Sequence, residues 1–237
     1  MDAPGLELQE TVKQDELVRF FSVLSHDLKS PIFSIDGFSD LLLADYEDRL
    51  DEEGQDFLRR IRSSAQQMKR VLDEMSHMVK LLSRPNARRP TSLREIAEEV
   101  LLKYNFQIEE GGVKVDVGED LPTVSVDPEK IREALGALVS NALFFNDQPK
   151  GERTMAIEST AVDGHYRICV RDNGIGIDPR YLSQIFELGL KLDKARGGGP
   201  GYGLYLAKRV AESHGGSVTA DSALSHGSTF CLSLPAA

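Results

Sequence analysis

The segment IRSSAQQMKRVLDEMSHMVKLL, residues 61–82, decides the architecture of the first third of the chain. Its apolar residues alternate in steps of four and three, the spacing of one seam along a helix: Ile61, Ala65, Met68, Leu72, Met75, Val79 and Leu82. An earlier segment carries a similar seam, in which Pro31 occupies one slot: Leu17, Phe21, Leu24, Leu28, Ile35, Phe38 and Leu42. These patterns predict two long helices, the first over about residues 8–45, joined by a turn between Asp45 and Glu53.

Two narrow seams cannot enclose a hydrophobic core without leaving apolar surface in water. A four-helix bundle built from two copies of the hairpin solves this problem, so the sequence predicts an antiparallel helical hairpin within a homodimer. We assign residues 1–16 to a connecting helix or tail and residues 17–84 to the hairpin.

Pro85 and Pro90 interrupt the helical pattern, and we interpret residues 85–91 as a linker to a second domain over residues 92–237. Ser92 with Glu95 forms a capping box, and Asp127 followed by proline is typical of a helix start. Strand patterns occur at residues 113–117, 154–160, 165–170, 217–220 and 229–234, with a helix over about 203–214. The chain is therefore predicted to be an α+β multidomain protein, with the hairpin followed by an α/β sandwich whose helices cover one face of the sheet.

The formal net charge of −10 reflects 28 Lys and Arg against 38 Asp and Glu. The average surface would repel nucleic acid and anionic membranes, so we expect neither contact. No apolar run approaches the roughly 20 residues of a membrane helix, and no signal pattern opens the chain. We predict a cytoplasmic location, either as a free protein or as the cytosolic part of a longer or membrane-attached sensor. The two cysteines, Cys169 and Cys231, lack metal-type spacing and favour buried, unpaired thiols.

His26 lies two residues from both Leu24 and Leu28, so its side chain points about 160° away from the seam and into solvent. Asp27 is adjacent and Ser30 follows one turn later. An exposed imidazole beside a carboxylate can lose a proton at one nitrogen while the other attacks phosphorus. Pro31 costs the helix roughly 3 kcal/mol, a distortion that suggests a functional role.

Oxygen ligands and glycine loops recur in the second domain. Asn141 lies on a helix stripe beside the core face, and its carbonyl oxygen suits Mg²⁺. Asp172 ends a strand and opens a loop with Gly174 and Gly176, where a carboxylate can accept the amino group of adenine. Five glycines between residues 197 and 203 precede a helix, whose free N–H groups can meet a polyphosphate.

Ser25-His26-Asp27-Leu28-Lys29-Ser30-Pro31 resembles the H-box of bacterial sensor histidine kinases, and the resemblance covers about residues 20–235. The later segments resemble the sequence boxes of the GHKL, or Bergerat, ATPase domain of this family. These are the asparagine box at Asn141, the first glycine box at residues 172–177, the phenylalanine box at Phe186 and the second glycine box at residues 199–204. The resemblance implies an ATP-dependent kinase that phosphorylates His26 in a dimer and passes the phosphoryl group to an aspartate of a response regulator.

By the same resemblance, Asp27 is the general base, Ser30 positions water for dephosphorylation, and Asn141 is the ligand of Mg²⁺. The ATP-binding residues implied are Asn141, Asp172, Gly174, Gly176, Phe186, Gly199, Gly201, Gly203 and Leu204. Three positions depart from the family pattern: Ala137 replaces a second asparagine, Phe144 a basic residue, and Pro200 a small hydroxyl residue.

Two alternatives remain open, and the departures at positions 137 and 144 favour the first. The chain could be a histidine phosphotransfer protein or scaffold whose nucleotide domain is degenerate and binds ATP weakly or not at all. It could also be a GHKL ATPase clamp in which His26 has no role.

Overall fold

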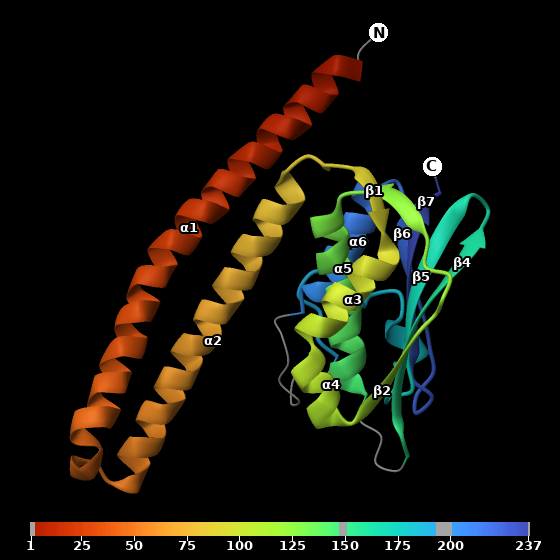
Figure 1. Ribbon diagram of the computed structural model, residues 1–237. Coiled ribbons are helices and arrows are strands. Elements are labelled where there is room, and N and C mark those ends of the chain that lie inside the picture. Colours follow the sequence, from red (N-terminus) through yellow and green to blue (C-terminus); the bar gives the residue numbers. More distant parts are fainter. Residues whose placement is uncertain (1–2, 147–150, 193–200, 237) are drawn as a thin grey trace. The chain divides into compact units, whose positions relative to one another are not determined.

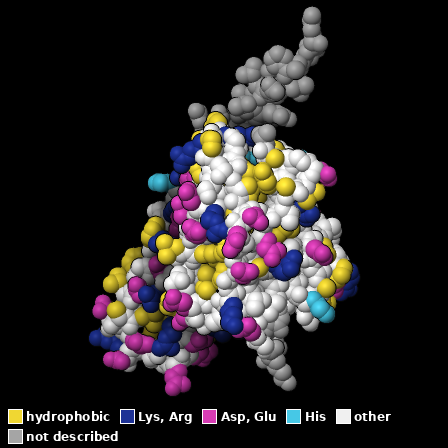
Figure 2. Space-filling model, turned by 45° about the vertical axis from the view of Figure 1, so that its right-hand side comes forward, with side chains coloured by type: hydrophobic (Ala, Val, Ile, Leu, Met, Phe, Trp, Pro, Cys, Tyr) yellow, Lys and Arg dark blue, Asp and Glu magenta, His cyan; other side chains and the backbone are white. Residues whose placement is uncertain are grey.

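The computed structural model describes residues 3–146, 151–192 and 201–236, with side chains from Phe21 onward except residue 22. The chain divides into two compact units, Met1–Arg84 and Pro85–Ala237, and each is described by itself. Among the described residues, no helix combines the length and the hydrophobicity that a membrane span requires. Acidic and basic side chains are interspersed over the face that Figure 2 shows.

The first unit is the predicted antiparallel hairpin. Helix α1 (Ala3–Tyr46) is followed by the short 3-10 helix η1 (Glu47–Arg49) and by α2 (Glu52–Ser83). The two long helices pack side by side, and the N-terminal part of α1 extends beyond α2 (Figure 1). The Asp51 side chain begins α2 by accepting a hydrogen bond from the Gly54 N–H at 2.8 Å. Ion pairs join the helices, from Lys29 to Asp73 at 2.6 Å and from Arg62 to Asp40 at 2.8 Å.

The hairpin buries only a narrow strip of each helix. On α1 the buried side chains are Ser25, Ile32 and Ser39, and on α2 they are Ala65, Met78 and Leu81. Large apolar side chains remain exposed beside this strip: Leu24, Leu28, Ile35, Phe38, Leu42, Ile61 and Met68. One copy of the hairpin therefore leaves most of the described α1 seam exposed, together with Ile61 and Met68 of the α2 seam.

The second unit has a layer of helices on one side of a five-stranded sheet, as predicted (Figure 1). The strand order is β2-β4-β5-β7-β6, with β2 parallel to β4 and every other pair antiparallel; β1 and β3 form a separate two-stranded sheet. The strands are β1 (Arg89–Ser92), β2 (Val113–Val117), β3 (Thr123–Val126), β4 (Arg153–Val162), β5 (His165–Asp172), β6 (Ser217–Ser222) and β7 (Ser228–Pro235). The helices are α3 (Leu93–Lys103), α4 (Asn105–Gly111), α5 (Pro128–Phe145), α6 (Gly203–Ser213) and the 3-10 turn η2 (Pro179–Tyr181).

The core of this unit lies between the helices and the sheet. Helix α5 packs on β5 and β7 through the predicted core face, of which Ile131, Leu135, Leu138 and Ala142 are buried. Alternate residues of each strand face these helices, so the sheet has one buried side and one outer side. Ser92 and Asp127 cap α3 and α5 as expected.

A buried polar network fixes the beginning of the second unit. The Lys130 ammonium donates to the Asn86 side-chain oxygen at 2.7 Å, and the Asp127 carboxylate accepts from the Ala87 N–H at 2.9 Å. The Asp127 N–H in turn donates to Nε2 of His214 at 3.0 Å. Since Arg89–Ser92 also pairs with β3, most of the segment expected to be a linker is bonded to the second unit.

The expectation of two unpaired thiols is wrong, because Cys169 and Cys231 form a disulfide. The two residues are 62 positions apart in the sequence, yet they lie directly opposite each other on β5 and β7. Only the strand pairing brings them together, and the spacing of the cysteines carried no signal of it.

Candidate functional site

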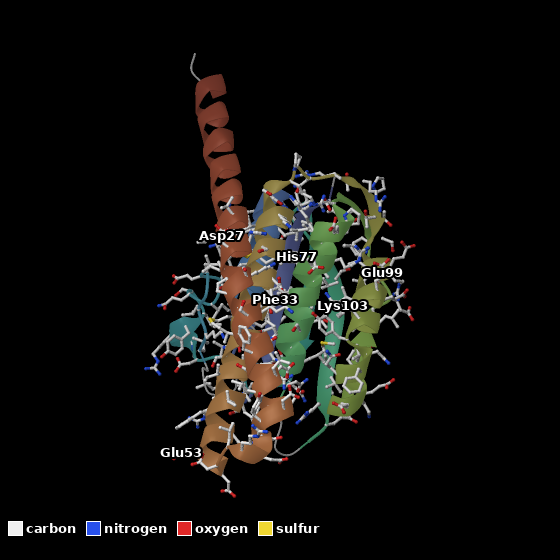
Figure 3. All side chains as sticks on the ribbon, turned by 90° about the vertical axis from the view of Figure 1, so that its left-hand side faces the viewer. Asp27, Phe33, Glu53, His77, Glu99 and Lys103 are labelled. Atoms are coloured by element: carbon white, nitrogen blue, oxygen red, sulfur yellow. A yellow bond between two sulfur atoms is a disulfide. The ribbon has the colours of Figure 1, made fainter. Side chains whose placement is uncertain are left out.

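The imidazole of His26 is held in solvent on α1. Its side chain is 87% exposed, and its Nδ1 lies 3.2 Å from the Asp27 carboxylate, which is itself 70% exposed. Asp27 is marked on α1 in Figure 3. Pro31 has no N–H to donate to the Asp27 carbonyl four residues earlier, so this turn lacks one helix hydrogen bond. Ser30 is exposed one turn beyond His26. The structure therefore brings the three predicted residues of the hairpin together.

A hollow of about 240 Å³ between α1 and α2 borders His26. Lys29 and Lys80 line it and supply positive charge beside the imidazole. Ser25 and Ser76 also line it, and their hydroxyl oxygens are buried with no hydrogen-bond partner among the described residues. Cations and hydroxyl donors of this kind stabilise the oxygens of a phosphoryl group.

The Asp172 carboxylate ends β5 and is only 6% exposed. Its Oδ1 accepts hydrogen bonds from the Gly174 N–H at 2.8 Å and from the Ser228 N–H at 3.3 Å. Burial raises the pKa of Asp172 above its usual value, and these two N–H groups offset part of the rise. Oδ2 makes no hydrogen bond within the described residues and is not sealed from solvent, so it remains available to a ligand.

The loop after Asp172 needs its two glycines for different reasons. A side chain on Gly174 would overlap the Phe145 carbonyl oxygen, which accepts the Ile175 N–H at 3.1 Å. Gly176 has φ of +67°, and a side chain there would overlap the carbonyl oxygen of Ala223. The loop is thereby fixed between the end of α5 and the turn before β7, beside the free oxygen of Asp172.

The predicted ligand stripe of α5 is half-buried or exposed, unlike the core face. The Asn141 amide is half-buried and makes no hydrogen bond to another described residue. Ala137 lies against the first residue of α6, since a Cβ on Gly203 would come within 3.3 Å of the Ala137 Cβ. Phe144 is exposed and packs edge-on against Phe145 with ring centroids 4.8 Å apart.

The segment after η2 contacts the described end of the second glycine loop. The Phe186 ring packs edge-on against Phe230 of β7, with centroids 6.4 Å apart. The Gly189 N–H donates to the Gly201 carbonyl at 3.2 Å, and Gly201 has φ of +85°. Gly203 and Leu204 begin α6. Gly199 and Pro200 lie outside the described residues.

Two family models match the chain, one over the helical hairpin and one over most of the second unit. Residues 16–84 match the His Kinase A (phospho-acceptor) domain. Residues 126–237 match the histidine kinase-, DNA gyrase B-, and HSP90-like ATPase family. The chain belongs to the sensor histidine kinases and carries their transmitter core. The predicted family and fold class are thus confirmed.

Curated relatives of this transmitter core are sensor proteins of greater length. It is 32% identical to cyanobacterial phytochrome B of Nostoc sp. over 97% of this chain and 30% of the relative. It is 30% identical to the methanogenesis regulatory histidine kinase FilI of Methanothrix harundinacea, over 97% of this chain and 26% of that protein. The sensor protein TorS of Escherichia coli is also 30% identical, over 91% of this chain and 24% of TorS. The chain thus spans about three-tenths or less of each.

Solved histidine kinases share the fold. Full-length ShkA in complex with AMPPNP superposes with a TM-score of 0.69 at 23% identity, over 92% of this chain and 45% of ShkA. The histidine kinase AdeS of Acinetobacter baumannii gives a TM-score of 0.56 at 18% identity, over 89% of this chain and 98% of AdeS.

Sequence reasoning missed three residues that shape the nucleotide side of this transmitter core. Ser228 donates to Asp172, although 56 positions separate them. Asn173 accepts from the Thr154 N–H at 2.9 Å and donates to the Glu152 carbonyl at 2.8 Å, which ties the first glycine loop to β4. Asn146 donates to the Thr154 carbonyl, while its own side-chain oxygen is buried without a partner among the described residues. Of the three, only Asn146 and Asn173 could have been singled out from the sequence, because both flank predicted loops, where asparagine is common.

Proposed function

We propose that this chain is an ATP-dependent protein-histidine kinase that phosphorylates its own His26 and passes the phosphoryl group to an aspartate of a response regulator. The observation that carries the proposal is the exposed His26 imidazole beside Asp27 in a chain that also has an ATPase domain. It would act in the cytoplasm, where ATP is available.

The Asp27 carboxylate fixes the reactive form of the imidazole. Accepting the Nδ1–H at 3.2 Å leaves the lone pair of Nε2 free to attack phosphorus. As the bond from Nε2 to the γ-phosphorus forms, the bond from that phosphorus to the bridging oxygen breaks, ADP leaves, and positive charge develops on the ring. Asp27 stabilises that charge or takes the Nδ1 proton, while Lys29 and Lys80 face the added phosphoryl oxygens from the neighbouring hollow. Ser30 would position water for a second activity, the dephosphorylation of the response regulator.

The residues of the second unit fit an adenine nucleotide. The free Oδ2 of Asp172 is an acceptor for the amino group of adenine, and the close backbone contacts that Gly174 and Gly176 allow fix the loop beside it. The unpaired amide of Asn141 would hold Mg²⁺, an ion that neutralises triphosphate charge. Phe186, Gly199, Gly201, Gly203 and Leu204 would border the phosphates. ShkA, which shares the fold, was crystallised with the ATP analogue AMPPNP.

The exposed seams of the hairpin support a homodimer. Leu28, Ile35 and Phe38 on α1, with Ile61 and Met68 on α2, are each at least 40% exposed in one copy. Pairing two hairpins would bury these side chains in a four-helix bundle, at a gain of about 25 cal/mol for each Å² of apolar surface removed from water.

Phosphorylation of purified protein with radiolabelled ATP and Mg²⁺ tests the kinase activity. Wild type is expected to gain label that is stable in alkali and released by acid, as a phosphoramidate is, whereas His26→Gln gains none. The matched control is His77→Gln, because His77 is an exposed histidine on α2 of the same hairpin (Figure 3).

His77→Gln should label like wild type. Equal labelling of His26→Gln and wild type would contradict the assignment of His26 as the phosphorylated residue. If no variant is labelled and none binds nucleotide measurably, the alternative of a histidine phosphotransfer protein or scaffold would be favoured instead. A chase with a receiver domain should then move the label from His26 to an aspartate.

A further inference from the structure

The outer side of the five-stranded sheet carries a disulfide that the kinase reaction does not use. Cys169 of β5 and Cys231 of β7 form a directly opposed pair. Ile168 and Val170 flank Cys169, and Phe230 and Leu232 flank Cys231. All four are buried, so the alternation along each strand places both sulfurs on the side of the sheet away from the helices. The two cysteines line a hollow of about 440 Å³ on that side.

We propose that Cys169 and Cys231 form a reversible thiol–disulfide site, which exchanges with low-molecular-weight thiols and disulfides, and that its oxidation tightens the nucleotide site. The second half of this proposal rests on the proposed nucleotide site. Disulfides in reducing compartments are usually transient and redox-sensing. Because the chain contains two cysteines in total, no other pairing within one copy competes.

The surroundings of the pair make Cys169 the more reactive of the two cysteines. Cys169 is half-buried and open to the hollow, whereas Cys231 is only 5% exposed. Arg167 and Arg171 flank Cys169 at two residues on either side, on the same side of β5, and both line the hollow. Cationic neighbours favour the thiolate, which is the reactive form of cysteine. Glu158, which pairs with Arg171 at 3.8 Å, and Asp221 also line the hollow, so the attraction of an anionic disulfide such as glutathione disulfide rests on Arg167.

The exchange balances in two steps. The Cys169 thiolate attacks one sulfur of glutathione disulfide, forming a mixed disulfide and releasing one glutathione thiolate. The Cys231 sulfur then attacks Sγ of Cys169, so that the protein disulfide forms and the second glutathione leaves. In total, two protein thiols lose two electrons and two protons, and the small disulfide gains them. Excess reduced glutathione drives the same steps backward.

The disulfide is joined to the nucleotide site through two strands. Asp172 lies three residues after Cys169, and Ser228 lies three residues before Cys231. The disulfide is therefore about 10 Å along the strands from the pair of Asp172 and Ser228. Asp172 and Ser228 form the last pair of this ladder, and the Ser228 N–H donates to the Asp172 carboxylate at 3.3 Å. Strand ends open more readily than strand centres. A cross-link near that end keeps Ser228 beside Asp172 and holds the carboxylate ready for its ligand.

Equilibrating the full wild-type chain in glutathione buffers tests the first half. Mass spectrometry after alkylation should count two free thiols in reduced glutathione and none in oxidised glutathione, with full return on reduction. Oxidised protein should run as a single chain on a non-reducing gel. Two free thiols in both buffers, or a band of covalently linked chains, would overturn the proposal. Cys231→Ala leaves Cys169 alone and should form a mixed disulfide with glutathione.

Binding of a fluorescent ATP analogue with Mg²⁺ tests the second half. Oxidised wild type should bind roughly three- to tenfold more tightly than reduced wild type. Cys169→Ala/Cys231→Ala should match reduced wild type in both buffers. Equal affinities of oxidised and reduced wild type would refute the coupling. If neither form binds nucleotide, the proposed function fails, and hydrogen exchange then tests the coupling. Slower exchange of the Ser228 and Gly174 N–H groups on oxidation would support the coupling, and unchanged exchange would reject it.

Discussion

Asp172→Asn should separate nucleotide binding from folding. An asparagine can keep its carbonyl oxygen at the Oδ1 position, where it still accepts the Gly174 and Ser228 N–H groups. Its amide nitrogen then replaces Oδ2 and presents hydrogen-bond donors to the donor amino group of adenine. The folded loop is retained, while the one contact left open for the ligand changes from acceptor to donor.

The size of the loss follows from that single contact. A hydrogen bond to a charged acceptor contributes about 1.5–3 kcal/mol. Since about 1.4 kcal/mol corresponds to a tenfold change, ATP affinity should fall by roughly 10- to 150-fold. The matched control is Asp116→Asn, because Asp116 is an exposed carboxylate on β2 of the same domain. Its affinity should equal that of wild type.

The same variant should be at least as stable as wild type at pH 7. Burial raises the pKa of Asp172, so the folded protein binds more protons than the unfolded chain between pH 3.8 and the folded pKa. Wild-type stability therefore falls as pH rises through that window, and the penalty stays at neutral pH. Asparagine does not titrate, so any advantage of Asp172→Asn should be largest at pH 7 and shrink toward pH 3.8.

Fluorescent-nucleotide titration gives the affinity of each variant, and urea denaturation at several pH values gives its stability. Nucleotide affinity of Asp172→Asn within twofold of wild type would refute the role of Oδ2. A variant that is markedly less stable than wild type at pH 7 would refute the claim that burial of this charge costs stability.

Three further changes test other parts of the chain. Burial lowers the pKa of His214, so the contribution of the neutral imidazole to stability is full above pH 6.5 and is lost as pH falls from 6.5 through the folded pKa. Denaturation between pH 7.5 and 5.5 should therefore show the unfolding free energy of wild type falling with pH, and that of His214→Gln falling less. Phe144→Lys should tighten ATP binding about fivefold at low salt, an effect that disappears at high salt and is absent in Phe144→Leu, as titration at two ionic strengths would show. Relative to oxidised wild type, Cys169→Ser/Cys231→Ser should lose about 4 kcal/mol of unfolding free energy because the disulfide closes a loop of 62 residues, and denaturation without reductant measures the difference.

Local signals in the sequence predicted most of the long elements. The seam of α2 and the Asp127 cap with its following proline depend only on residues within one turn of each other, so periodicity and capping rules identified them. Strands of four residues, such as β1 and β3, are too short for such a pattern and were missed. The seven-residue helix α4 was missed for the same reason.

Contacts between distant residues were beyond these rules. Periodicity predicts which face of a strand is buried but not which strand lies beside it, so neither the Cys169–Cys231 disulfide nor the Ser228 donor to Asp172 could be derived. The candidate site was predicted where each residue carries its own signal, as at His26 and Asp172. Their supporting residues carry no such signal, because they act only through the tertiary fold.

The buried network at the start of the second unit restricts where the chain can bend between the units. Helix α2 continues to Ser83, and from Asn86 onward the chain is bonded to the second unit, beginning with the Asn86 side-chain amide, which donates to the Ser213 carbonyl at 2.7 Å. Arg84 and Pro85 lie between these two points, and the proline restricts Arg84 to the extended conformation that it adopts. A swing of the ATPase domain toward His26 would therefore depend on few backbone bonds. Lengthening that connection would require the loss of both bonds of the Asn86 side chain, the one that it accepts from Lys130 and the one that it donates to the Ser213 carbonyl.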